Sequence, residues 1–174
     1  MRLLHAGRDR QSGQSMVEFA LVLTPLLLIL LGIVQFGFIF NAYVTLTNAA
    51  REAAREGSIY VYERTLTKDE NDEARNEAIK TALVSSMNFL STSAPQFTTT
   101  GAWSQTGSTW TDGDIEVTYS IPSGLDDSDA RLGQQVTVNA EFHQDLIVPL
   151  IAAILPRDAG GRLVLGAEVT MVIN

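Results

Sequence analysis

The chain has 174 residues, of which 45% are hydrophobic and 18% charged, with no cysteine and a formal net charge of −8. This length allows one modest domain plus one extra element, and the low charged fraction means that a core or a membrane span absorbs much of the chain. The acidic balance argues against nucleic acid as a partner, because phosphate binding needs clustered Lys and Arg. The absence of cysteine excludes a disulfide framework and thiolate metal sites.

An uncharged apolar run extends from Phe19 to Phe40. As a helix with a rise of about 1.5 Å per residue, it would be roughly 33 Å long, enough to cross a hydrocarbon core about 30 Å thick. We therefore predict a membrane-spanning helix over residues 14–40, with a local bend at Pro25. Positive residues before the run predict a cytoplasmic N-terminus and an exported C-terminal part. The charged residues before the run are Arg2, Arg8, Asp9 and Arg10.

Glu18 stands at the start of this apolar run, where an ionisable side chain is costly and is therefore a candidate for function. Gly13, five residues earlier, ends a basic leader over residues 1–13. Gln14 and Glu18 are four residues apart, so they share one face of a helix that begins after Gly13. The simpler alternative is that Glu18 lies at the lipid headgroup boundary, in contact with water.

The segment Gly13-Gln-Ser-Met-Val-Glu-Phe19 resembles the processing site of type IV pilin-like proteins. Together with Gly32-Ile-Val-Gln-Phe-Gly37 and Leu46 to Gly57, it resembles the TadE-like family, the minor pilins or pseudopilins of the tight-adherence (Flp, type IVc) pilus. The resemblance implies cleavage after Gly13 by a prepilin peptidase, with Gln14, Glu18 and Phe19 as the other residues of the processing site. It also implies that Glu18 is the assembly charge partner of a new amino group at Gln14. The implied partners are other pilin-like subunits, the pilus assembly machinery and membrane lipid.

Residues 41–58 are predicted to continue the same helix as a stalk, with Gly57 as its C-terminal cap. A stripe of apolar residues, mostly alanines, recurs at helical spacing along the stalk, and it packs against neighbouring stalks, against the domain's own core, or against each at different heights. The stripe consists of Ala42, Leu46, Ala49, Ala50, Ala53 and Ala54.

The segment Thr67-Lys-Asp-Glu70 is a capping-box pattern, which predicts the start of a second helix. The predicted apolar face of this helix consists of Ala74, Ala78, Ala82, Leu83, Met87 and Leu90. Four acidic residues at its start are expected to be solvated rather than to bind calcium, because the EF-hand spacing is absent. They are Asp69, Glu70, Asp72 and Glu73.

The Ser-, Thr- and Gly-rich composition of residues 91–113 predicts a long loop or an irregular hairpin. Trp103 and Trp110 within it either form an exposed partner-binding patch or pin the loop onto the core. Alternation with period two predicts three later strands. Their inner faces are Ile115, Val117, Tyr119 and Ile121; then Val136, Val138, Ala140 and Phe142; then Leu163, Leu165, Ala167, Val169, Met171 and Ile173.

The apolar segment Leu146–Leu155 is too short to span a bilayer. It predicts either a short helix that covers the core or an exposed surface that contacts a pilus partner or the membrane interface. The link before residue 133 has weak metal potential through Asp126, Asp127 and Asp129. His5 lies in the leader, and His143, near Asp145, has no recognisable catalytic or metal constellation. We therefore expect no enzyme, no metal and no cofactor.

These patterns predict an α+β fold, in which a long transmembrane helix continues into a stalk helix and precedes a small pilin-like domain. In this domain, residues 59–174, a second helix packs on an antiparallel sheet. The predicted function is a pilin-like subunit with a single span in the cytoplasmic membrane and an extracytoplasmic domain. The alternative is an uncleaved membrane-anchored binding or sensory domain.

Overall fold

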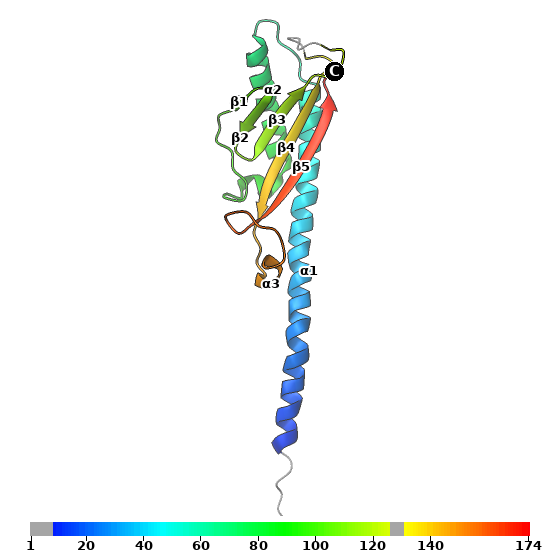
Figure 1. Cartoon of the computed structure of the whole chain (residues 1–174), viewed down its shortest axis with the longest axis vertical. Helices are drawn as coiled ribbons and strands as arrows, with labels where there is room; N and C mark the ends of the chain where they lie inside the picture. The colour runs from blue at the N-terminus through cyan, green and yellow to red at the C-terminus, as the bar shows by residue number, and fades with distance from the viewer. Residues whose placement is uncertain (1–8, 126–130) are drawn as a thin grey trace, which may run out of the picture.

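The computed structural model describes residues 9–125 and 131–174, with side chains from Gly13 onward. Figure 1 shows one long helix, α1, with the sheet and α2 gathered beside its C-terminal half. Helix α1 spans Asp9–Ser58 and continues through Pro25. The other elements are α2 (Lys68–Ser86), a 3-10 helix η1 (Asn88–Thr92), β1 (Ser104–Thr106), β2 (Thr109–Asp112), β3 (Ile115–Ser120), β4 (Gln135–Gln144), α3 (Pro149–Ala152) and β5 (Leu163–Val172).

The five strands form one antiparallel sheet in the order β1-β2-β3-β4-β5. Strands β4 and β5 pair from Gln135 opposite Val172 to Gln144 opposite Leu163. One face of the sheet packs on the helices and the other carries polar side chains toward solvent. In such an antiparallel sheet, hydrophobic and polar residues alternate along each strand. The α+β fold and the three alternating strands are therefore confirmed. Only Ile121 departs from the predicted inner faces, because β3 ends at Ser120 and leaves Ile121 exposed.

Two helices cover the inner face of the sheet. The C-terminal half of α1 contributes buried alanines and Leu46, and α2 contributes Ile79 and Leu83 together with Met87, the residue that follows it. The predicted capping box is confirmed, since the Thr67 side chain accepts a hydrogen bond from the Glu70 N–H and the Glu70 carboxylate accepts one from the Thr67 N–H.

The two ends of α1 differ from the prediction. The helix begins at Asp9 rather than after Gly13, so it includes the last residues of the leader. At the other end, Gly57 lies inside the last turn instead of capping it. A Cβ at Gly57 would lie 2.7 Å from Cδ1 of Ile79, so the missing side chain allows α1 and α2 to approach closely. Residues 1–8, with Arg2, His5 and Arg8, lie outside the described residues.

The buried face of α2 also differs from the prediction. Ala74, Ala78 and Ala82 are only half-buried. The buried stripe runs instead through Asn71, Asp72, Arg75, Asn76, Ile79, Leu83 and Met87. An apolar stripe was the wrong criterion here, because the N-terminal half of α2 buries polar side chains that have hydrogen-bond partners, mostly in other parts of the chain.

Residues 91–113 contain more structure than a loop, since β1 and β2 form the hairpin that was one of the two expectations. Trp110 is 6% exposed and belongs to the core, while Trp103 is half-buried against it. The expectation of an exposed tryptophan patch is therefore wrong. Both rings pin the hairpin to the domain, because burying so much aromatic surface is strongly favourable.

Candidate functional site

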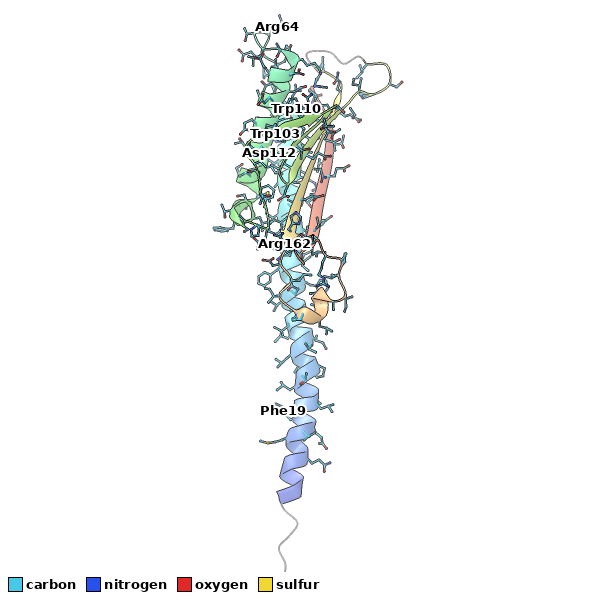
Figure 2. The ribbon with its side chains drawn as sticks, turned by 60° about the vertical axis from the view of Figure 1, so that its left-hand side comes forward. Phe19, Arg64, Trp103, Trp110, Asp112 and Arg162 are labelled. Atoms are coloured by element: carbon cyan, nitrogen blue, oxygen red, sulfur yellow. The ribbon has the colours of Figure 1, made fainter. Side chains whose placement is uncertain are left out.

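The N-terminal residues of the predicted processing site lie on a solvent-exposed helical turn. Gln14 donates a hydrogen bond from Nε2 to Oε1 of Glu18 over 3.0 Å, so the predicted shared face is confirmed. A Cβ at Gly13 would have no other atom within 4 Å. The side chain of Phe19 is 66% exposed and projects from α1 far from the domain (Figure 2). Gln14, Glu18 and Phe19 are all exposed, so none of them is part of the domain's core.

The N-terminal half of α1 has an apolar surface that the rest of the chain does not cover. Between Val17 and Phe40 its large side chains are largely exposed, for example Leu21 at 72% and Ile33 at 65%. Soluble monomers rarely expose a contiguous apolar surface of this size. By length and composition, the helix from Gly13 to Ser58 can cross a membrane, and its most apolar stretch is uncovered. This is consistent with a single-pass membrane anchor.

The C-terminal half of α1 has the opposite environment. Its stripe of apolar residues, from Ala42 to Ala54, is at most 1% exposed and packs on α2, β4 and β5. Of the expectations for this stripe, the one in which it covers the domain's own core is confirmed. The expectation that these alanines pack against neighbouring stalks is wrong, because the sheet already covers the face of α1 on which they lie.

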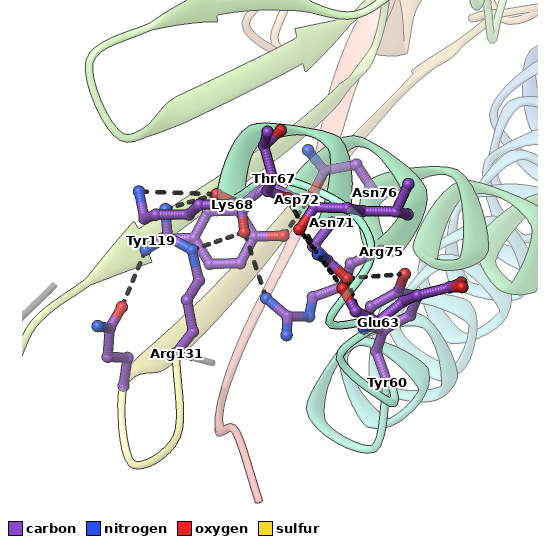
Figure 3. Close-up of polar contacts among 12 residues, drawn as sticks. Tyr60, Glu63, Thr67, Lys68, Asn71, Asp72, Arg75, Asn76, Tyr119 and Arg131 are labelled. Atoms are coloured by element: carbon purple, nitrogen blue, oxygen red, sulfur yellow. Dashed lines mark hydrogen bonds and ion pairs between the residues drawn. The ribbon is translucent and has the colours of Figure 1, made fainter. Parts of the chain in front are cut away.

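A buried cluster of charged side chains joins the start of α2 to the segment just before β4 (Figure 3). Asp72, 1% exposed, accepts two hydrogen bonds of 2.6 Å from the guanidinium of Arg131. Arg75 lies 3.4 Å from the same carboxylate, and Lys68 lies 4.0 Å from it. The expectation that this acidic residue is solvated is therefore wrong. Asp72 is paired with Lys68 and Arg75 of its own helix and with Arg131 from a distant part of the chain.

Aromatic rings complete the cluster. The guanidinium of Arg75 lies 5.0 Å from the ring centre of Tyr60, and that of Arg131 lies 4.2 Å from the ring centre of Tyr119. The Tyr119 hydroxyl donates to Oδ1 of Asn76 over 2.7 Å. Burial raises the pKa of Tyr119 above its ordinary value. The tyrosine therefore stays neutral, and the cluster is a structural connection between α2 and the sheet rather than a reactive centre.

A second polar connection lies where the hairpin meets α2, near Trp103 and Asp112 in Figure 2. The Asp112 carboxylate accepts a hydrogen bond from Lys80 over 3.2 Å and another from the Thr100 hydroxyl over 2.7 Å. Burial alone would raise the pKa of Asp112, but the hydrogen bonds from Thr100 and Lys80 outweigh it and lower the pKa. Trp103 donates from its ring nitrogen to Glu77, which connects the hairpin to α2 a second time.

His143 does not form a catalytic pair with Asp145. Its Nδ1 lies 2.8 Å from Asp158 and its Nε2 lies 3.4 Å from Asp114, while the Asp145 carboxylate accepts from Gln96 instead. Two carboxylates thus hold the ring between the β2–β3 turn and the loop before β5. In residues 13–125 and 131–174, no group of three or more His, Asp or Glu side chains could hold a metal ion. The acidic residues Asp126, Asp127 and Asp129 lie outside the described residues.

Sequence reasoning missed the role of Gln35. This amide is 1% exposed although it belongs to the uncovered half of α1. It bonds to the backbone of residues 145–148, more than a hundred positions further along the chain. A lone polar side chain within an apolar run was the signal available, because such residues in membrane segments usually have a partner.

The fold and the uncovered helix define the class of this protein. It is a protein with an α+β domain carried on a single apolar N-terminal helix. The TadE-like protein family model matches residues 13–55, less than half of the chain, and this match confirms the TadE-like resemblance of that segment. The match suggests a protein associated with the tight-adherence pilus. No curated protein and no solved structure matches the chain significantly.

Proposed function

We propose that the chain is a pilin-like subunit, a pseudopilin or minor pilin, of a tight-adherence type IVc pilus. A prepilin peptidase cleaves it after Gly13, and α1 later leaves the membrane to pack among the helices of other pilin-like subunits. The uncovered N-terminal half of α1, which begins with the Gln14–Glu18 pair, supports this proposal most strongly. A helix of this kind needs an apolar environment from outside its own chain, and both lipid and a bundle of like helices supply one.

In this proposal the chain has a basic leader over residues 1–13, a span over residues 14–40, a stalk over residues 41–58 and an extracytoplasmic domain over residues 59–174. The positive residues of the leader keep the N-terminus in the cytoplasm, where the peptidase acts. The scissile bond lies inside α1, one turn from its first residue, Asp9. Cleavage therefore needs only the fraying of a helix end, which costs little.

Glu18 has the central role in assembly. Cleavage creates an α-amino group at Gln14, mostly protonated at neutral pH because the pKa of such a group is about 7.7–8.0. The carboxylate of Glu18 lies one turn away on the same face, and it pairs with this amine or with that of a neighbouring subunit. An unpaired carboxylate in an apolar bundle is costly, so this pairing sets the register between subunits.

Mass spectrometry of the membrane-isolated protein tests the cleavage step. We expect the N-terminus at Gln14 in the wild type and at Met1 in Gly13→Val, because the side chain blocks close approach of the peptidase to the backbone. Gly37→Val is the matched control, since a Cβ at either glycine meets no other atom within 4 Å. A wild type that retains Met1 would leave the uncleaved anchored domain as the better description, and normal cleavage of Gly13→Val would contradict the assignment of Gly13 as the processing residue.

Pilus output tests the charge pairing. We expect Glu18→Leu to insert in the membrane but to assemble poorly, and Glu18→Gln to assemble poorly as well although it keeps a partner for Gln14. Val17→Leu, an exposed neighbour on another face, should assemble normally. Normal pilus output from Glu18→Gln would show that the charge has no role in assembly.

A further inference from the structure

The apolar segment 146–155 lies beside α1 instead of covering the sheet. Figure 1 shows α3, which lies within this segment, next to the middle of α1 and apart from the strands. Three of its large side chains are exposed, Ile147 at 69%, Leu150 at 54% and Ile154 at 77%. The expectation of a short helix that covers the core is therefore wrong, and only Val148 is fully buried in the segment.

Gln35 holds this segment on α1. Its Oε1 accepts a hydrogen bond from the Ile147 N–H over 2.7 Å and one from the Val148 N–H over 3.4 Å, and its Nε2 donates to the Asp145 carbonyl over 3.2 Å. One turn nearer the N-terminus, a Cβ at Gly32 would lie 3.7 Å from Cδ1 of Ile151. The absence of a side chain at Gly32 therefore leaves room for α3 to pack against α1. Both contacts lie within the proposed span.

The contacts with α1 give the segment a definite depth. If Glu18 lies at the cytoplasmic boundary, then Gly32 is about 21 Å and Gln35 about 26 Å from it along a helix that rises about 1.5 Å per residue. Both distances are shorter than the hydrocarbon thickness of about 30 Å. The segment therefore lies at the depth of the outer leaflet, the level at which Ile33 and Phe36 of α1 are also exposed.

The backbone of the segment suits that environment. The backbone N–H groups of Ile147, Val148 and each residue from Ile151 to Leu155 donate hydrogen bonds to acceptors within the chain. Pro149 and Pro156 have no N–H to satisfy. Unsatisfied backbone groups are costly at membrane depth, and these internal hydrogen bonds reduce that cost for most N–H groups of the segment. The nearest charged residues, Asp145 and Arg157, stand at the two ends of the segment.

We propose that residues 146–155 insert into the outer leaflet of the membrane as a second lipid contact, held at that depth by Gln35. One helix alone leaves a domain free to rotate about the helix axis and to move in and out of the membrane. A second contact sets the depth and the rotation of the sheet relative to the bilayer. This proposal rests on the membrane placement of α1 in the proposed function, and it is independent of cleavage after Gly13.

Fluorescence quenching in lipid vesicles tests the proposal. The chain has no cysteine, so single-cysteine variants of the full chain can carry an environment-sensitive dye. The labelled positions are Ile154→Cys in the segment, Ile33→Cys in the span and Val61→Cys, which is 84% exposed in the loop after α1. The vesicles contain phosphatidylcholine, phosphatidylglycerol and a lipid with a spin label on its acyl chain. We expect strong quenching at Ile154→Cys and Ile33→Cys and little at Val61→Cys.

The three positions separate the possible failures. Quenching at Ile33→Cys without quenching at Ile154→Cys would overturn the lipid contact and leave the membrane anchor intact. Quenching at neither position would instead overturn the anchor and the proposed function with it. If the dye at Ile154→Cys is shielded in native membranes but not quenched in pure lipid vesicles, the surface binds a protein and the proposal is wrong.

Gln35→Leu tests the part played by the amide. We expect this change to reduce quenching at Ile154→Cys, because the Ile147 and Val148 N–H groups lose their acceptor, and to leave quenching at Ile33→Cys unchanged. Gln105→Leu, in the exposed strand β1, is the matched control and should change neither signal. Undiminished quenching at Ile154→Cys in the Gln35→Leu background would contradict the role of Gln35.

Discussion

The two halves of α1 belong to one continuous helix but depend on different surroundings. From Ala42 onward the helix is built into the domain, and its small side chains are buried against α2 and the sheet. Before Gly32 its most apolar stretch is not buried by the rest of the chain, so its apolar surface needs lipid or other helices. The same secondary structure therefore serves as part of a core in one half and as an unsatisfied contact surface in the other.

This difference means that substitutions in the two halves should affect different measurements. Both tryptophans, Trp103 and Trp110, lie in the domain, and α1 contains none. Tryptophan fluorescence of the full chain in detergent micelles, followed in urea, therefore reports the unfolding of the domain. Changes in the uncovered half of α1 should leave this transition unaltered and change assembly instead.

The largest loss of stability is expected for Asp72→Asn. The change removes the charge that the buried guanidiniums of Arg75 and Arg131 share, and breaking a buried ion pair in this way costs about 3–5 kcal/mol. The urea midpoint should fall accordingly. Asp69→Asn, one turn earlier and exposed, is the control and should change the midpoint little. Equal effects of the two changes would show that the buried cluster does not stabilise the domain.

The direct comparison of the two halves is Ala53→Leu against Ala20→Leu. Ala53 is fully buried, and inserting a larger side chain into a packed core typically costs about 1–3 kcal/mol. Ala20 is exposed on the uncovered half, so a leucine there has room. We expect only Ala53→Leu to lower the urea midpoint. A similar loss for Ala20→Leu would mean that the N-terminal half of α1 also packs on the domain.

A smaller loss is expected for Thr67→Ala, which removes the hydroxyl acceptor of the capping box. Loss of an N-terminal cap costs about 1 kcal/mol. Thr81→Ala, an exposed threonine in the middle of α2, is the control, and alanine there should be neutral or slightly stabilising. A wild-type midpoint for Thr67→Ala would indicate that tertiary contacts alone fix the start of α2.

Acid should produce the smallest change. The Thr67 N–H lowers the pKa of Glu70, and the Arg162 N–H lowers the pKa of Asp158. A lowered folded-state pKa contributes stability above the unfolded value, about 4 for a carboxyl, and this is lost as pH falls through the folded value. We expect a constant urea midpoint from pH 5 to 7 and a decline below about pH 4. Glu70→Gln keeps the capping geometry without the charge, so its decline should be shallower, and an unchanged slope would exclude Glu70 as a contributor.

Much of the fold could be predicted because its signals are local. The capping box at Thr67 is four consecutive residues, and the inner faces of β4 and β5 follow from alternation along each strand. The pairing of Gln14 with Glu18 follows from helical spacing alone. The hairpin β1–β2 was harder to predict, because strands of three and four residues are too short for a clear alternation.

The length and composition of the first 40 residues, together with strand alternation, were enough to determine an apolar helix and an antiparallel sheet, since each pattern depends only on neighbours in sequence. The tertiary structure alone decided which polar residues are buried. Asp72 meets Arg131 across 59 positions, and Gln35 meets the Ile147 N–H across 112. No local pattern reveals such pairs, because the energy that makes burial of a polar group acceptable comes from a partner that only the folded chain brings near.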